Sequence, residues 1–150
     1  PLPTRNMSSA ASDVYNRQIK ECLSRKSKGV KTSVIVTGSH TIKSQGETIN
    51  HFKKDKIPIS YSFKILDKTD SKGVKDNFKK SFDGFFAAYE KIKPDVVVLL
   101  GDRYEIFSAC SAAFVHQIPI CHLHGGELTR GSIDDGFRHS ITKMSNLHLV

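Results

Sequence analysis

DVVVLLGDRYE at residues 95–105 and PICHLHGGE at residues 119–127 are the stretches that decide the fold. The strands predicted within them, Val96–Leu100 and Pro119–Leu123, are almost entirely apolar, which is typical of parallel strands buried on both faces of a sheet. Each strand leads directly into glycine and charged residues. Because ligands of open α/β sheets bind beyond the carboxyl ends of the strands, the sequence predicts a binding site at that edge.

Strand-like and helix-like segments alternate along the rest of the chain. Further strands are predicted at Thr32–Thr37, Ile59–Ile65 and Leu147–Val150, and helices at Asp13–Ser24, Glu47–Lys54, Val74–Ile92, Tyr104–His116 and Ser132–Met144. The alternation predicts an α/β fold with a Rossmann-like parallel sheet, right-handed crossovers and helices on both faces. The length suits one domain, so we expect residues 1–150 to form a single unit.

The cysteine content and the lack of long apolar runs indicate where in the cell the protein is expected. The cysteines are odd in number (Cys22, Cys110 and Cys121) and form no CxxC pattern, which indicates reduced thiols and a cytoplasmic protein. No apolar run reaches the roughly 18 residues of a membrane span, and no signal-peptide pattern opens the chain. We therefore expect no membrane partner.

The net charge of +8 is concentrated in the first part of the chain. Residues 1–93 hold 19 lysines and arginines against 9 acidic residues, whereas residues 94–150 hold 4 against 6. These cations are interpreted mainly as a solvated surface, with attraction of an anionic ligand as the alternative. Because basic residues do not interleave with aromatic ones, nucleic acid is not an expected partner.

Ionisable residues gather at or just after the ends of the two apolar strands. They are Asp102, Arg103, His122, His124, Glu127, Asp134, Asp135, Arg138 and His139. Asp102 and Arg103 follow the first strand directly, where a turn exposes side chains to the crevice; alternatively, Asp102 caps the helix that begins near Tyr104. His40 follows another predicted strand, and it either faces the same crevice or is an ordinary loop residue.

His122 and His124 lie two residues apart on a predicted strand, which places both side chains on one face. Gly125 and Gly126 then let the backbone approach a ligand closely. Three interpretations stay open for the histidines: acid–base catalysis or phosphate contact, a metal pair, and a structural role. Spacing fixes no third metal ligand nearby, so no metal is assigned.

Helix Ser132–Met144 is predicted to carry charges along one side. Asp134 and Arg138 are four residues apart and share a face, as do Asp135 and His139. An arginine placed there can hold a phosphate or a carboxylate. The alternative is two surface salt bridges, with one of the acids serving only the helix dipole.

The combination of GDRYE at residues 101–105, HLHGGE at 122–127 and IDDGFRHSITKMSNLH at 133–148 resembles the hydrolysing UDP-N-acetylglucosamine 2-epimerases of sialic-acid and related nonulosonic-acid pathways. A weaker, collinear likeness covers Ser33–Asn50. The resemblance implies two Rossmann-like domains in the glycosyltransferase-B arrangement, with a UDP-sugar bound between them. This chain then corresponds to most of the first, catalytic domain. On this resemblance, the sequence is expected to lack the family's opening strand and second domain, and only Pro3-Thr4-Arg5 matches the loop after that strand.

The reaction that the resemblance implies has two steps. Elimination of UDP across C1–C2 gives a 2-acetamidoglycal, and water then adds, so that UDP-N-acetylglucosamine yields N-acetylmannosamine and UDP. Only proton transfers are needed, so no metal or redox cofactor is expected. The complete protein is expected to be a homo-oligomer (a dimer or tetramer), and the 150-residue chain alone is expected to be inactive.

The resemblance also implies roles for individual residues. Asp102 and Asp134 match carboxylates that transfer protons in the family, and Arg138 lies close to them. Where some relatives carry a third carboxylate this chain has His124, and Glu127 is a possible substitute. Substrate contacts are expected from His40, Arg103, His122, Gly125, Gly126, Asp135 and His139.

Two other functions compete with this interpretation. A metal-dependent phosphoesterase would explain Gly101-Asp102-Arg103 after a strand together with the histidine pair. Such enzymes usually carry an upstream Asp-x-His, and none precedes Asp102. A non-catalytic binding or assembly module would keep the fold and have no turnover.

Overall fold

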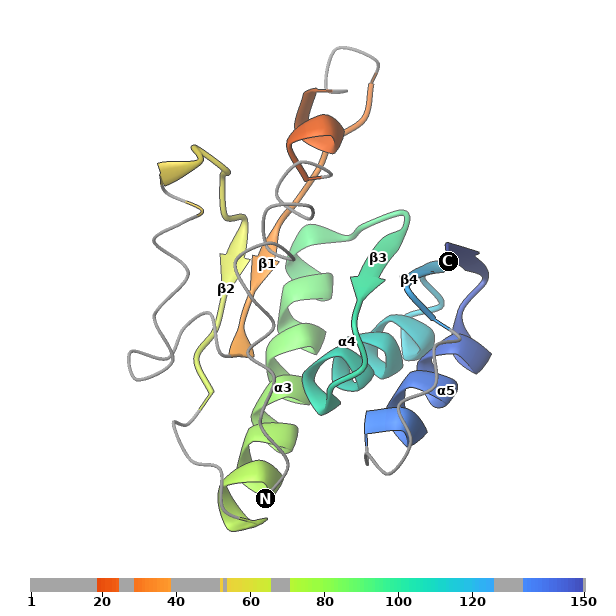
Figure 1. The fold of residues 1–150 in the computed structure, drawn as a ribbon. Coiled ribbons are helices and arrows are strands. Elements are labelled where there is room, and N and C mark those ends of the chain that lie inside the picture. Colours follow the sequence, from red (N-terminus) through yellow and green to blue (C-terminus); the bar gives the residue numbers. More distant parts are fainter. Residues whose placement is uncertain are drawn as a thin grey trace.

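The computed structural model describes residues 19–24, 29–38, 52, 54–65, 71–125 and 134–149. Its elements are β1 (Ile35–Val36), β2 (Tyr61–Ser62), α3 (Ser71–Ile92), β3 (Val97–Leu100), α4 (Tyr104–Val115), β4 (Ile120–Leu123), α5 (Asp134–Met144) and β5 (Leu147–Leu149), as Figure 1 shows. Residues 19–24 are also helical. Within the described residues the predicted alternation of strands and helices is confirmed, although β1 and β2 are shorter than expected. Most of the predicted helix Glu47–Lys54 and residues 13–18 of the predicted helix Asp13–Ser24 lie outside the described residues.

All strand pairs are parallel, as predicted. β1 pairs with β2, and β3, β4 and β5 form a second sheet in that order. Leu99 of β3 lies in register with His122 of β4, which in turn lies in register with His148 of β5. The carboxyl ends of β3 and β4 therefore meet at one edge of the second sheet.

Helix α3 packs against both sheets. Phe85 and Tyr89 belong to the core cluster that includes Ala109 of α4. Phe63, just after β2, meets Phe85 edge to face with ring centroids 5.0 Å apart. A Cβ atom at Gly84 would come within 2.5 Å of the Phe63 ring. The missing side chain thus lets α3 approach β2 closely.

The described residues cover one face of the second sheet more completely than the other. Val97 and Leu99 are 8% and 5% exposed and pack in the core with α4 and α5. Val98 and Leu149, on the opposite face, are 59% and 50% exposed. The predicted burial of both faces is confirmed for β4, where Cys121 on the Val98 face is 7% exposed. It is not met for Val98 of β3, because the helices in the described part of the chain pack on the Val97 face.

Two expectations from composition concern thiols and membranes. All three cysteines are free, and Cys110 and Cys121 are buried. Burial raises the pKa of Cys110 to about 11, so this thiol is neutral and serves as core packing. Among the described residues, no helix combines the length and the apolar character needed to cross a membrane.

Candidate active site

Gly101 turns the chain at the end of β3. Its φ of 94° lies in the left-handed region that favours glycine, and it places Asp102 and Arg103 between β3 and α4. Arg103 is the cap residue of α4, with extended backbone (φ −78°, ψ 164°) and no capping hydrogen bond from its side chain. Because the cap position belongs to Arg103, the structure does not support the interpretation of Asp102 as a helix cap.

Asp102 instead pairs with Arg138 of helix α5. The Nη2 group of Arg138 donates a hydrogen bond to Oδ2 of Asp102. The side chains are 10% exposed for Arg138 and 23% exposed for Asp102, so the pair lies at a shielded part of the sheet edge. A charge-assisted bond of this kind orients both partners strongly. Two predicted site residues, 36 positions apart in the sequence, are thus brought together.

Asp135 and His139 form a second pair on α5. The His139 Nε2 atom lies 3.6 Å from Oδ2 of Asp135, as the i, i+4 spacing predicted, and the His139 side chain is 52% exposed. Such a pair is ionic only when the imidazole is protonated, and at this exposure solvent screens most of the attraction. This pair therefore belongs to the surface of α5.

His122 is fully buried beneath the sheet edge. Its Nε2 atom lies 3.0 Å from the carbonyl oxygen of Gly101, and its Nδ1 atom lies 3.2 Å from Oγ1 of Thr142 in α5. Burial lowers the pKa of His122, and the positive charge of Arg138 adds to this effect, against opposing contributions from the Gly101 carbonyl and Asp102. Both ring nitrogens are engaged, which leaves neither for a metal ion.

His124 does not share the environment of His122. β4 ends at Leu123, and His124 follows in the left-handed region with φ 57°. It is exposed, and its backbone N–H donates to the carbonyl of Leu149 at 2.8 Å. The predicted alternation of a strand therefore does not reach His124, and the expectation that both histidines present side chains to the same crevice is not met.

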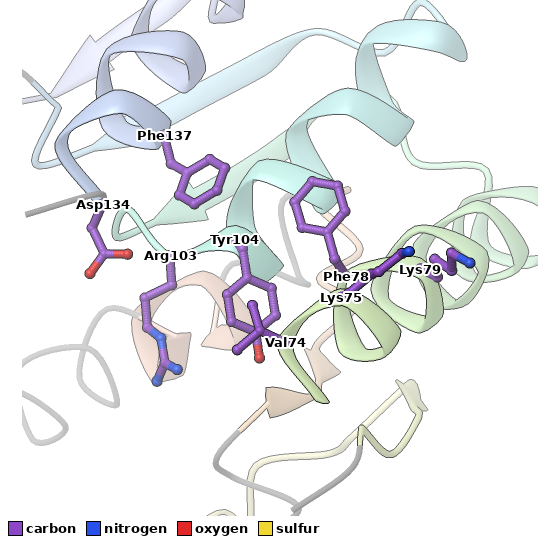
Figure 2. Close-up of a pocket in the computed structure, with 8 residues that line it drawn as sticks. All are labelled: Val74, Lys75, Phe78, Lys79, Arg103, Tyr104, Asp134 and Phe137. Atoms are coloured by element: carbon purple, nitrogen blue, oxygen red, sulfur yellow. The ribbon is translucent and has the colours of Figure 1, made fainter. Parts of the chain in front are cut away.

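A cavity of about 600 Å³ opens beside Arg103 between α3 and the first turns of α4 and α5. It is lined by Val74, Lys75, Phe78, Lys79, Arg103, Tyr104, Asp134 and Phe137. Figure 2 shows Asp134 and Arg103 on one side, Lys75 and Lys79 on the other, and aromatic rings between them. The arrangement suits a ligand that combines negative charge with apolar surface.

Sequence reasoning missed most of the wall formed by α3. Lys75 and Lys79 are four residues apart and share a helix face, but the lysines of this region were interpreted as a solvated surface. Phe78 lies within the predicted helix Val74–Ile92, for which no ligand contact is predicted. Its ring lies 6.2 Å from that of Phe137 in α5. Nothing in the local sequence indicates that α3 and α5 meet, so no pattern could have identified this wall.

Glu105 is a second residue that the prediction did not single out. It is 5% exposed, and its Oε2 atom lies 3.5 Å from Nε of Arg103. A Cβ atom at Gly38 would lie 3.4 Å from Oε1 of Glu105. Gly38, two residues after the end of β1, therefore lies next to the first turn of α4, the helix that follows β3.

Three predicted site residues, His40, Gly126 and Glu127, lie outside the described residues. Gly125 is described and buried. A Cβ atom there would come within 2.7 Å of Nδ1 of His122. Its missing side chain thus makes room for the histidine ring, whereas the prediction assigned the space to a ligand. Within the described part of the chain, no three histidine, cysteine or acidic side chains are placed to hold a metal ion.

Known protein families provide an independent comparison. The family model described as UDP-N-acetylglucosamine 2-epimerase matches residues 23–150. The chain is 42% identical over 128 residues to the GDP/UDP-N,N'-diacetylbacillosamine 2-epimerase (hydrolyzing) of Campylobacter jejuni, covering 82% of this chain and 32% of that protein. It is 37% identical to the polysialic acid biosynthesis protein P7 of Escherichia coli, covering 84% and 32%. The chain thus spans about a third of the length of these relatives.

Solved structures share the fold. A UDP-N-acetylglucosamine 2-epimerase superposes with a TM-score of 0.72 over 89% of this chain and 36% of its own, at 20% identity. The Neisseria meningitidis UDP-GlcNAc 2-epimerase, crystallised with UDP-GlcNAc, gives 0.70 over 87% of this chain and 35% of its own, also at 20% identity. These likenesses establish the Rossmann-like α/β fold.

Proposed function

Because the chain belongs to the UDP-N-acetylglucosamine 2-epimerase family, we propose that it forms the catalytic amino-terminal half of a hydrolysing 2-epimerase. Its substrate is a UDP-2-acetamido sugar, in the simplest case UDP-N-acetylglucosamine, which yields N-acetylmannosamine and UDP. The observation that carries the proposal is the Asp102–Arg138 pair at the sheet edge. The identity of 42% to a relative named as hydrolyzing supports the hydrolytic outcome.

The proposed chemistry needs groups that move protons and groups that hold negative charge. Removal of the C2 proton requires a base, and hydration of the glycal requires an acid–base group. Asp102, whose carboxylate Arg138 orients, and Asp134, at the start of α5, take the proton-transfer roles in this proposal. Glu127 and the exposed His124 are alternatives for the remaining step.

Cations around the cavity suit the departing pyrophosphate. Among the described residues, Lys75, Lys79 and Arg103 line it together with one acidic residue, Asp134. Such an excess of positive charge attracts an anionic substrate and stabilises negative charge that develops on the leaving group. Asp135, His139 and Gly126 remain proposed substrate contacts, as does His40.

In this proposal, the sheet edge and the cavity described above form one side of the active site. In the proposal, a second domain of the complete polypeptide holds most of the nucleotide, and the 150-residue chain alone has no turnover. The complete protein acts as a cytoplasmic homo-oligomer and uses no metal or redox cofactor, because elimination and hydration are proton transfers.

The test uses the complete polypeptide that carries this chain, purified in a chelating buffer and incubated with UDP-N-acetylglucosamine and, separately, with a UDP-diacetamido-trideoxyhexose. We expect stoichiometric release of UDP and a 2-epimeric free sugar from at least one of them. The Asp102→Asn protein is the matched control, since it keeps the shape of the site and removes its carboxylate. Absence of UDP release from both sugars would overturn the proposal, as would activity that returns only after a divalent metal is restored.

A further inference from the structure

The buried ring of His122 forms a second connection between the turn after β3 and helix α5, beside the Asp102–Arg138 pair. Its Nε2 atom meets the Gly101 carbonyl oxygen at 3.0 Å, and its Nδ1 atom meets the Thr142 hydroxyl at 3.2 Å. A carbonyl oxygen can only accept, so the proton of a neutral ring is on Nε2. Nδ1 then accepts a hydrogen bond from the Thr142 hydroxyl.

The Gly101 carbonyl is part of the peptide group that continues into Asp102. A hydrogen bond to that oxygen therefore fixes the plane of the Gly101–Asp102 peptide, and with it the direction in which the Asp102 side chain leaves the backbone. Gly101 has a φ of 94°, which glycine adopts readily, but the same freedom leaves the turn with few backbone restraints, so its direction needs tertiary support. The ring of His122 supplies such support from the neighbouring strand.

Thr142 and Arg138 are one helical turn apart on α5 and share a face. The turn after β3 is thus joined to that face of α5 twice. One connection is neutral and runs from Gly101 through His122 to Thr142. The other is ionic and joins Asp102 to Arg138. Two bonds a turn apart resist both sliding and rotation of α5 relative to the turn, which a single bond would not.

Gly125 completes the arrangement. A Cβ atom at this position would lie 2.7 Å from Nδ1 of His122 and 2.8 Å from Oγ1 of Thr142. Both distances are too short for real contacts, and the clash would fall on the two atoms that form the hydrogen bond. The residue types at 122 and 125 in the HLHG sequence are therefore explained by one structural requirement.

We propose that His122 is a positioning residue for the reaction, which acts by holding the Gly101–Asp102 peptide so that Asp102 meets both Arg138 and the substrate. This inference rests on the proposed function for its catalytic consequence. Its structural part, the control of the Asp102 backbone by the His122 ring, stands on the hydrogen bonds alone.

Two substitutions of His122 distinguish the role of the Nε2 atom from that of the Nδ1 atom. His122→Gln places an amide near the position of Nε2 and can still donate to the Gly101 carbonyl. His122→Asn places an amide near the position of Nδ1 and can reach only Thr142. In the complete polypeptide, we expect His122→Asn to lower kcat by about 10²-fold, the loss typical of a misplaced catalytic group, and His122→Gln to lose about tenfold less. Thr142→Val should lower the melting temperature while costing less kcat than His122→Asn.

Each outcome decides the inference. Equal losses of kcat in folded His122→Gln and His122→Asn proteins would overturn it, because both variants disturb packing and only one breaks the bond to Gly101. Should His122→Asn not fold, Gly125→Ala displaces the ring without removing its nitrogens, and an unchanged kcat in that variant would overturn the inference.

A second measurement keeps this inference separate from the proposed function. In amide spectra of the 150-residue chain, His122→Asn should shift the backbone N–H of Asp102 and the Nε–H of Arg138, whereas His122→Gln should leave both near their original positions. If the wild-type enzyme releases no UDP, the proposed function fails and these spectra still test the positioning. If the signal of the Asp102 backbone N–H does not shift in His122→Asn, the proposed positioning by His122 is wrong.

Discussion

Helix α5 carries ionic groups on two sides, and the sides differ in what they do for the molecule. On the inner side, the 8% exposed Arg138 reaches across to Asp102, which comes from the turn after β3. On the outer side, His139 meets Asp135 of the same helix, with the His139 side chain 52% exposed. The inner pair joins α5 to the turn after β3, whereas both residues of the outer pair belong to α5. Shielding and distance along the chain, and not the residue types, distinguish the inner pair from the outer pair.

The largest effect should come from removing the inner carboxylate. Asp102→Asn keeps an oxygen that can accept from Arg138, so we expect the melting temperature to change little. Turnover in the complete polypeptide should fall by about 10²–10⁴-fold, as for loss of one proton-transfer group. Steady-state assays of UDP release together with thermal unfolding test this. A variant with near wild-type kcat would remove Asp102 from the chemistry and leave the inner pair purely structural.

Removal of the inner cation should affect folding as well as function. Arg138→Ala leaves the Asp102 carboxylate in a shielded position without its partner, and we expect a loss of about 3 kcal/mol in the free energy of unfolding, at the low end for a broken buried pair because Asp102 keeps some solvent contact. KM should rise while kcat falls, since orientation and binding are both weakened.

Urea unfolding of the 150-residue chain and UDP-release kinetics of the complete polypeptide measure the two effects of Arg138→Ala. Arg138→Lys is the matched control, because it keeps the charge and loses the planar fork that binds a carboxylate. It should recover part of the stability. If Arg138→Ala and Arg138→Lys both unfold like the wild type, the inner pair contributes no more than a surface contact.

The neutral connection beside the inner pair predicts a dependence on pH. Burial holds the pKa of His122 below its ordinary 6.5, and Arg138 and His148 act in the same direction, while Asp102 and the Gly101 carbonyl oppose them. As the pH falls, the His122 ring is therefore protonated in the unfolded chain before it is protonated in the folded chain. The stability that His122 contributes is therefore fully present above the unfolded pKa and is lost as the pH falls below it.

A comparison of wild type and His122→Gln measures how much His122 contributes to the change of stability with pH. Urea midpoints recorded between about pH 7.5 and 5 should fall more steeply with acidification for the wild type than for His122→Gln, which has no titrating ring at this position. Parallel curves for the two proteins would show that His122 is not held neutral by the fold.

The sheet edge and the charged helix α5 could both be predicted from the sequence, but the contacts between them could not. Apolar strands that end in Gly101-Asp102 and in the His122 to Gly125 segment located the edge of the sheet correctly. Periodicity paired Asp135 with His139, because both lie within one helix. The same periodicity offered Asp134 as the neighbour of Arg138, and it could not reveal Asp102, since that contact depends on how α5 packs beside the turn.

Strand alternation failed for a related reason. It placed His122 and His124 on one face, but the left-handed backbone at His124 ends the alternation one residue after β4. Burial of His122 follows from packing against Thr142 and Gly101, which lie 20 and 21 residues away. Local patterns place the segment at the edge of the sheet, and tertiary packing decides which of its side chains are exposed and which are buried against the backbone.

The smallest effect should come from the outer pair. Asp135→Asn and His139→Gln remove a contact that solvent already screens, and each should change the free energy of unfolding by no more than about 0.5 kcal/mol. If the two residues also contact substrate, as proposed, KM should rise with little loss of kcat. Urea unfolding and UDP-release kinetics on the same two variants check both statements. A destabilisation as large as that of Arg138→Ala would mean that the outer side of α5 is packed against the rest of the protein, and the contrast between the two sides of the helix would be lost.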